Sequence, residues 1–137
     1  MTRSPLVVIL AATALLSSCK KTPEGPKTEL TVGVQSEPMG GIVSALHVVV
    51  KIAGNVVTDE TVKPPHGSKV GFPQPWEKTY PSDGHDDAKV EVEVDAIGDP
   101  NAKDPLIRRF ASTTFVPGKS SLLRVNLESR CVVYPVV

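Results

Sequence analysis

The sequence has few cysteines and few aromatic residues, and it carries no net charge. Two cysteines cannot form the dense disulfide framework of a small secreted domain. Fifteen basic residues balance fifteen acidic ones, so no overall field attracts nucleic acid, and no basic stripe is interleaved with aromatic residues. Nucleic acid is therefore not a predicted partner. A convincing amphipathic helical pattern is also missing, which disfavours a helical fold.

The longest apolar run is too short to cross a membrane. Residues 6–16 form a largely apolar run of eleven residues, whereas a helix needs about 20 apolar residues to span a bilayer core. A transmembrane anchor is therefore not expected. At 137 residues the chain has the length of one ordinary domain, which buries roughly two thirds of its unfolded surface.

The first residues have the order of a secretory signal. Arg3 supplies a positive charge, residues 6–16 are apolar, and the small residues Ser17 and Ser18 follow. This order predicts a signal peptide over residues 1–18 that is removed and does not belong to the fold.

The stretch "LSSC" at residues 16–19 resembles the lipobox of bacterial lipoproteins. In that family an apolar residue stands three places before the cysteine, and small residues lie between. The resemblance implies that Cys19 becomes the mature N-terminus and carries diacylglycerol and commonly a further acyl chain such as palmitate. Two or three chains anchor a protein stably, because each buried methylene contributes about 0.8 kcal/mol. The alternative is an ordinary cleaved signal followed by a disulfide between Cys19 and Cys131.

The residues after Cys19 indicate a destination and a tether. In the best-studied bacterial lipoproteins an aspartate at the next position signals retention in the inner membrane, so Lys20 implies the outer membrane. Residues 19–28 are predicted to be the lipidated cysteine and a flexible tether, since residues 20–28 hold two prolines and three lysines without apolar periodicity. At about 3.1 Å per residue, this segment places the domain up to about 28 Å from the lipid surface.

Alternation with a period of two dominates the predicted domain, residues 29–137. In "KVEVEVDA", residues 89–96, valines alternate with carboxylates, as in a strand with one face buried and one face in water. Seven strands are predicted in this way, at residues 29–35, 44–53, 56–62, 75–80, 89–97, 106–116 and 121–128.

Seven short strands with turn signals in about 100 residues predict an all-β fold. The predicted architecture is a seven-stranded antiparallel β-sandwich, either immunoglobulin-like or transthyretin-like. The Cys…Trp…Cys spacing of immunoglobulin domains is absent. Gly54-Asn55 predicts a type II′ hairpin that pairs Ile52 with Val57, and Pro117-Gly118 predicts a type II turn.

Two loops contain groups that could bind a metal ion. One holds His85, Asp86 and Asp87, and the other holds Asp95, Asp99, Asn101 and Asp104. Neither has the ligand spacing of a zinc site or an EF-hand, and turn formation explains both loops. No metal ion or cofactor is predicted.

Nucleophilic catalysis has no recognisable residues. A Gly-x-Ser-x-Gly elbow is absent. His47 lies within a valine-rich predicted strand, His66 lies beside two prolines, and Cys131 has no partner histidine that the sequence identifies. No catalytic residue is predicted.

Two adjacent arginines admit two interpretations. Arg108 and Arg109 could capture an anionic ligand, or they could pair across strands with Glu91 or Glu93. We favour the pairing. The apolar positions of "LIRRFA" change parity at these arginines, which predicts a bulge or a strand end.

The predicted binding surface in the sequence is an aromatic loop. Phe72, Trp76 and Tyr80 recur every four residues among prolines, a spacing suited to contact with a glycan or another envelope protein if they are exposed. The alternative is that they pack against the ends of the sandwich.

We therefore expect a lipid-anchored cell-envelope protein that acts by binding or scaffolding, with no enzymatic activity. A second interpretation is an accessory lipoprotein subunit of a secretion or envelope-assembly machine, because small sandwich lipoproteins resembling transthyretin serve such roles. A third is a metal-dependent hydrolase that uses the aspartate-rich loops, which lacks a recognisable nucleophile or base. If Cys19 is lipidated, Cys131 has no partner within the chain.

Overall fold

The computed structural model describes residues 25, 27–39, 41–63 and 76–132. These residues form seven strands and a short 3-10 turn: β1 (Glu29–Ser36), β2 (Ala45–Ile52), β3 (Asn55–Val62), β4 (Trp76–Pro81), β5 (Lys89–Ile97), β6 (Ile107–Thr114), β7 (Ser120–Leu127) and η1 (Ser129–Cys131). All seven predicted strands are present, and their ends differ from the predicted ends by two residues at most. The prediction of an all-β fold is confirmed.

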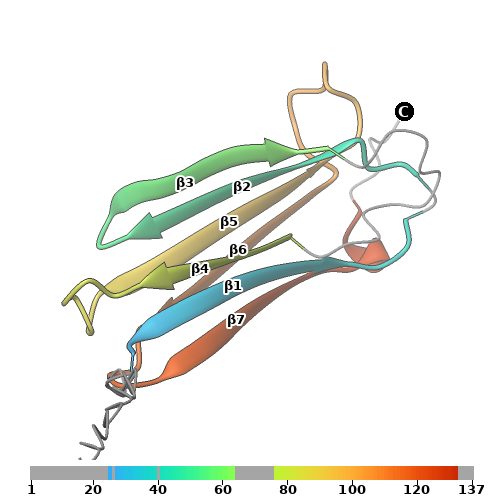
Figure 1. Cartoon of the computed structure of the whole chain (residues 1–137). Coiled ribbons are helices and arrows are strands. Elements are labelled where there is room, and N and C mark those ends of the chain that lie inside the picture. The colour runs from blue at the N-terminus through green and yellow to red at the C-terminus, as the bar shows by residue number, and fades with distance from the viewer. Residues whose placement is uncertain (1–24, 26, 40, 64–75, 133–137) are drawn as a thin grey trace, which may run out of the picture.

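The strands form two sheets that pack face to face (Figure 1). One sheet has three strands in the order β4-β1-β7, and the other has four in the order β3-β2-β5-β6. The alternation of β5 explains its place in the larger sheet, because its valines are buried between the sheets while Glu91 and Glu93 face outward and are half-buried.

The core between the sheets consists mainly of valine and leucine. Its largest fully buried side chains are Leu30, Leu46, Ile107, Leu127, Val32, Val34, Val48, Val50, Val90, Val92 and Val94. Burial of a side chain of this size contributes about 1.5–3 kcal/mol relative to exposure in water. The core is therefore built almost entirely from the alternating positions of the strands.

One strand pair contradicts the antiparallel prediction. β1 runs parallel to β7, in a register that joins Glu29 to Ser120 and Ser36 to Leu127, whereas the other four pairs are antiparallel. A tight hairpin makes its two strands antiparallel. β1 and β7 are separated by most of the chain, so no hairpin sets their direction.

The β2–β3 hairpin turn lies one residue before the predicted position. Ile52 pairs with Asn55, not with Val57, so Ala53 and Gly54 form the two-residue loop. Both have positive φ, 49° and 81°, which is typical of a type I′ turn and not of the predicted type II′ turn. The register then shifts between Val50 and Lys51, where β3 carries a bulge.

The predicted turn at Pro117-Gly118 is confirmed. Gly118 has a φ of 67°, and the N–H of Lys119 donates to the carbonyl of Val116 at 3.1 Å. Proline at the second position and a positive φ at the third are the features of a type II turn.

The predicted bulge or strand end at Arg108-Arg109 is absent. The β5–β6 register runs without a shift from Ala96–Ile107 to Lys89–Thr114. Arg109 occupies an inward position in phase with Ile107, and Phe110 points outward and is 71% exposed. The apparent change of parity is therefore an inward arginine followed by an outward phenylalanine in a regular strand.

The chain enters the sandwich at the end that carries the β2–β3, β4–β5 and β6–β7 turns (Figure 1). Thr28 is held there by two neighbours: its Oγ1 accepts from the N–H of Gly118 at 2.8 Å, and its carbonyl accepts from the N–H of Ser82 at 3.0 Å. The first residues of β1 are thus firmly attached at one end of the sandwich.

Candidate functional site

The outward face of the four-stranded sheet arranges polar and apolar side chains in rows. Directly paired residues of neighbouring strands present their side chains on the same side of a sheet. The registers of β2, β5 and β6 align three such rows: His47–Asp95–Arg108, Val49–Glu93–Phe110 and Lys51–Glu91–Ser112. The middle row places a carboxylate between two apolar residues.

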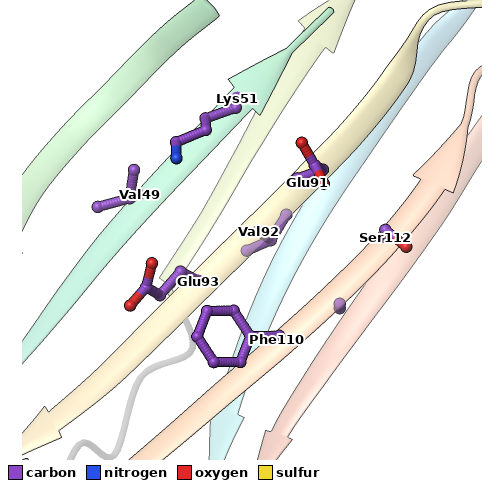
Figure 2. Close-up of a pocket in the computed structure, with 8 residues that line it drawn as sticks. Val49, Lys51, Glu91, Val92, Glu93, Phe110 and Ser112 are labelled. Atoms are coloured by element: carbon purple, nitrogen blue, oxygen red, sulfur yellow. The ribbon is translucent and has the colours of Figure 1, made fainter. Parts of the chain in front are cut away.

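A shallow groove of about 290 Å³ lies over the second and third rows (Figure 2). Its walls come from β2, β5 and β6, and Figure 2 shows the Glu93 side chain between those of Val49 and Phe110. Phe110 is the most exposed large apolar side chain among the described residues, at 71%. Single exposed apolar residues are ordinary, but this one borders a groove that also contains carboxylates.

The carboxylate of Asp95 is neutralised by Arg108. Nε and Nη2 of Arg108 donate to the two carboxylate oxygens, each at 2.7 Å. The Asp95 side chain is only 11% exposed, so a forked ion pair satisfies a carboxylate that is largely removed from water. The hydrogen bonds to Asp95 and its charge raise the pKa of Arg108 above its ordinary value.

Glu93 shares the same arginine at a longer distance. Its Oε1 lies 3.3 Å from Arg108 Nε, which already donates to Asp95. Glu91 has a closer cation, because Lys89 Nζ donates to its Oε1 at 2.6 Å. This hydrogen bond and the charge of Lys89 lower the pKa of Glu91, and the charge of Lys51 lowers it to a smaller extent. Glu93 is therefore the carboxylate of the groove with the weakest pairing.

The predicted pairing of the arginines is partly corrected. Arg108 contacts Glu93, as predicted, but its main partner is Asp95. Arg109 faces the interior and meets neither Glu91 nor Glu93: its Nη2 donates to Cys131 Sγ at 3.0 Å. Its Nε is buried and has no hydrogen-bond partner within the described part of the chain.

Cys131 lies in η1 and is a free, half-buried cysteine. It packs against the hydrophobic core next to Arg109. The other cysteine, Cys19, lies outside the described residues, so its lipidation stays a prediction, as does the alternative disulfide.

The aromatic residues of the predicted binding loop lie in different places. Trp76 begins β4, is half-buried and packs against the core. Tyr80 is 7% exposed in β4 and its hydroxyl lies 2.6 Å from the Thr58 hydroxyl on the opposite sheet. Both side chains thus contact the core, as the packing alternative expects. Phe72 lies outside the described residues, and binding through it stays a prediction.

The candidate metal ligands do not form a cluster. His85 and Asp86 belong to a tight turn in which Ser82 donates to Asp86, and Asp99 accepts from the N–H and side-chain amide of Asn101. Asp95 is bonded to Arg108 instead. Within residues 25, 27–39, 41–63 and 76–132, no group of three or more His, Cys, Asp or Glu side chains could hold a metal ion.

Of the remaining two histidines, the structure describes His47 only. His47 lies on the outward face, and its Nε2 is 2.8 Å from Asp59 Oδ1 on β3. It thus makes a diagonal cross-strand contact, because Asp59 pairs with Val49 and not with His47. His66 lies outside the described residues.

Sequence analysis did not identify Phe110 as a surface residue. The available signal was its phase, because Phe110 lies three positions after the buried Ile107 and therefore on the opposite face of a regular strand. An arginine at an inward position concealed that phase.

Comparisons with known proteins supply no relative for the chain. No protein-family model matches it, and no curated protein matches it significantly. Across the residues that the structure describes, no helix has the length and apolar character needed to cross a membrane.

Proposed function

We propose that this chain is a lipid-anchored protein of the bacterial cell envelope, carried by the outer membrane, and that its sandwich is a non-catalytic binding or scaffolding module. The anchor rests on the resemblance of "LSSC" at residues 16–19 to a lipobox and on Lys20 after Cys19. The observation that supports the binding role is the exposed Phe110 beside a groove on a regular sheet face. Aromatic side chains that settle into a partner's surface commonly supply much of the energy of an interface.

The fold supports this role through the position of the tether. Thr28 is fixed at one end of the sandwich, so in an anchored protein that end lies nearest the lipid surface. The groove lies on the side of the sandwich, along strands that run from the anchored end to the far end (Figure 1). A partner in the same compartment could reach it from beside the domain.

The strand order favours the transthyretin-like alternative for the sandwich. In immunoglobulin constant-type domains the first and second strands belong to one sheet. Here β1 and β2 lie in different sheets, and β1 pairs in parallel with β7. The order β4-β1-β7 against β3-β2-β5-β6 resembles the transthyretin arrangement. It also favours the second candidate function, an accessory lipoprotein subunit of a secretion or envelope-assembly machine.

The anchor is tested by the intact mass of the mature protein. We expect a chain that begins at Cys19 and carries the mass of a diacylglycerol with a further acyl chain, and no lipid on the Cys19→Ser variant. An unmodified N-terminus in the wild type, or a disulfide between Cys19 and Cys131, would contradict the anchor.

The binding role is tested by photo-crosslinking in intact cells. A photoreactive phenylalanine analogue replaces Phe110 in one strain and Leu122, 53% exposed on the other sheet, in a second strain. We expect a discrete adduct from position 110 that position 122 does not give. The same adducts from both positions, or none from position 110, would remove the groove as a binding surface.

A further inference from the structure

A row of carboxylates runs along the centre of the outward face. Glu91, Glu93 and Asp95 alternate on β5 with their side chains on the same side, so successive members of the row are about 6.4–6.8 Å apart along the strand. Arg108 neutralises Asp95 and Lys89 pairs with Glu91. The face therefore has its least compensated negative charge at Glu93, in the middle of the groove.

The surroundings of Glu93 favour a cation from outside. Its side chain is 32% exposed and lies between Val49 and Phe110 (Figure 2). Among the described residues, only one of its oxygens has a partner, the arginine shared with Asp95. A positive charge that reaches the second oxygen would be partly shielded from water by the two apolar side chains, which strengthens the attraction.

Phe110 favours arginine over other cations. A guanidinium stacks on an aromatic ring and donates in a planar fork to a carboxylate, whereas an ammonium does neither as well. The groove, at about 290 Å³, is at the lower end of the range for small-molecule pockets. Its size suits one or two side chains of a longer segment.

We infer that the groove binds an extended segment of a partner protein that presents arginine, with the guanidinium on Phe110 and Glu93. The inference rests on the proposed binding role and specifies the chemistry of the partner. An extended segment with arginines two residues apart matches the spacing of Glu93 and Glu91 on β5. The site at Glu91 is less favourable for a second arginine, because Lys51 already lies opposite Glu91 at the edge of the groove.

A second copy of this chain does not fit the same face. Two copies packed face to face would place the carboxylate row of β5 against its own counterpart, and like charges at close range are unfavourable. An anionic partner would likewise meet Glu91 and Glu93. The charge on the face is therefore complementary to a basic partner.

The test measures binding of three probe peptides to the mature lipoprotein in detergent micelles. The probes are the acetylated, amidated pentapeptides Thr-Arg-Thr-Arg-Thr, Thr-Lys-Thr-Lys-Thr and Thr-Glu-Thr-Glu-Thr. We expect the arginine peptide to bind several-fold more tightly than the lysine peptide and the glutamate peptide not to bind. The arginine and lysine peptides carry the same charge, and the mature chain without Arg3 has 14 basic and 15 acidic residues, so an overall field does not explain a preference for arginine.

Matched variants locate the binding. Phe110→Ala and Glu93→Gln are each expected to lower the affinity for the arginine peptide at least fivefold. Leu122→Ala and Glu77→Gln change an exposed leucine and an exposed glutamate on the other sheet. These two variants are expected to leave the affinity for the arginine peptide unchanged. Fluorescence of Trp76, the single tryptophan of the chain, verifies that each variant is folded.

Three results would overturn the inference. One is equal binding of the arginine and glutamate peptides, and another is arginine binding that is insensitive to both groove variants. The third is self-association in sedimentation experiments that Phe110→Ala abolishes, which would identify a second copy as the occupant. If position 110 crosslinks a partner in cells while the arginine peptide fails to bind, the proposed function stands and the partner chemistry is wrong. If the peptide binds while position 110 gives no adduct in cells, the proposed binding function is contradicted and the preference of the groove for arginine is kept.

Discussion

The contact between Thr58 and Tyr80 places two hydroxyl groups inside a core of valines and leucines. The two oxygens lie 2.6 Å apart, one on each sheet, and both residues are buried. Burial raises the pKa of Tyr80 above its ordinary value of 10.0, so the phenol stays protonated and available for the hydrogen bond. One hydroxyl thereby donates to the other, although both residues are buried.

Tyr80→Phe is expected to lower the free energy of unfolding by about 1–3 kcal/mol, because the Thr58 hydroxyl then remains buried without a partner. Urea denaturation monitored by Trp76 fluorescence measures the loss. Replacing both residues, Thr58→Val with Tyr80→Phe, should recover most of it, since no buried hydroxyl is left unsatisfied. A double variant that loses the sum of the two single losses would show that the hydrogen bond is not the cause.

Gly98 is required by a close contact with Leu106. A Cβ at Gly98 would lie 2.6 Å from Leu106 Cδ1, 2.8 Å from Leu106 Cγ and 3.2 Å from the Ile42 carbonyl oxygen. Gly98→Ala is therefore expected to lower the free energy of unfolding by about 1–3 kcal/mol, as overpacking does. Gly33→Ala is the control, because its Cβ would meet only Leu122 Cδ1 at an ordinary 3.6 Å. Equal denaturation midpoints for the two variants would contradict the steric argument.

At this scale the sequence predicted packing better than it predicted the surface. It indicated correctly that the valines of β5 face the core, since their alternation is unbroken. It did not indicate that Arg109 points inward to Cys131 or that Phe110 points outward. Those orientations depend on which neighbours the register of β6 supplies, and a single strand does not contain that information.

Among the elements, the β2–β3 turn shows how a short loop can differ from its strongest sequence signal. Ala53 has a φ of 49°, a region in which a side chain costs roughly 1–2 kcal/mol and in which glycine and asparagine are preferred. The strained turn at Ala53-Gly54 is accompanied by the pairing of Ile52 with Asn55, which extends the β2–β3 ladder to the turn.

Ala53→Gly is expected to raise the free energy of unfolding by up to about 1 kcal/mol, because the strain is relieved. Ala53→Val at the same position should lower it, since a β-branched side chain tolerates positive φ least. Thermal unfolding by circular dichroism compares the two. Shifts in the same direction for both variants would show that the turn is not of type I′ in solution.

The 3-10 turn η1 is held by the carboxylate of Glu37, the residue that follows β1. Glu37 Oε2 accepts hydrogen bonds from both the backbone N–H and the hydroxyl of Ser129, each at 2.9 Å. These bonds lower the pKa of Glu37 below its ordinary value of 4.5. The stabilisation is therefore complete above pH 4.5 and is lost as the pH falls through the lowered pKa of the folded state.

Glu37→Gln is expected to lower the thermal midpoint at neutral pH, and the difference from the wild type should shrink as the pH falls below about 4.5. At low pH the protonated glutamic acid and the glutamine become similar acceptors. Thermal midpoints of both proteins between pH 3 and pH 7 measure this dependence. A constant difference across that range would show that the charge of Glu37 is not responsible.

On the scale of the whole molecule, Thr28 leads into β1 at one end of the sandwich, and under the proposed anchoring that end would lie nearest the lipid surface. The contacts of Thr28 with Gly118 and Ser82 place that end beside the β6–β7 turn. Since these contacts involve only residues of the described sandwich, we expect the domain to fold without the lipid. Anchoring and folding are thus expected to be separable.

Cys19→Ser is expected to move the protein from the membrane fraction to the soluble periplasmic fraction, because acyl chains supply the membrane affinity. Fractionation followed by immunoblotting measures the change, and an unaltered circular dichroism spectrum verifies that the sandwich still folds. A variant that remains fully in the outer-membrane fraction would contradict lipid anchoring at Cys19.

The sequence by itself determined the seven strands and the all-β fold, because the alternation of apolar and polar residues is a local property of each strand. It also contains the stretch at residues 16–19 that resembles a lipobox, on which the predicted anchor rests. Only the tertiary structure decided that β1 runs parallel to β7, that Arg109 lies inside and that Phe110 stands beside Glu93. These features depend on the direction and register of strands far apart in the chain, which no local pattern specifies.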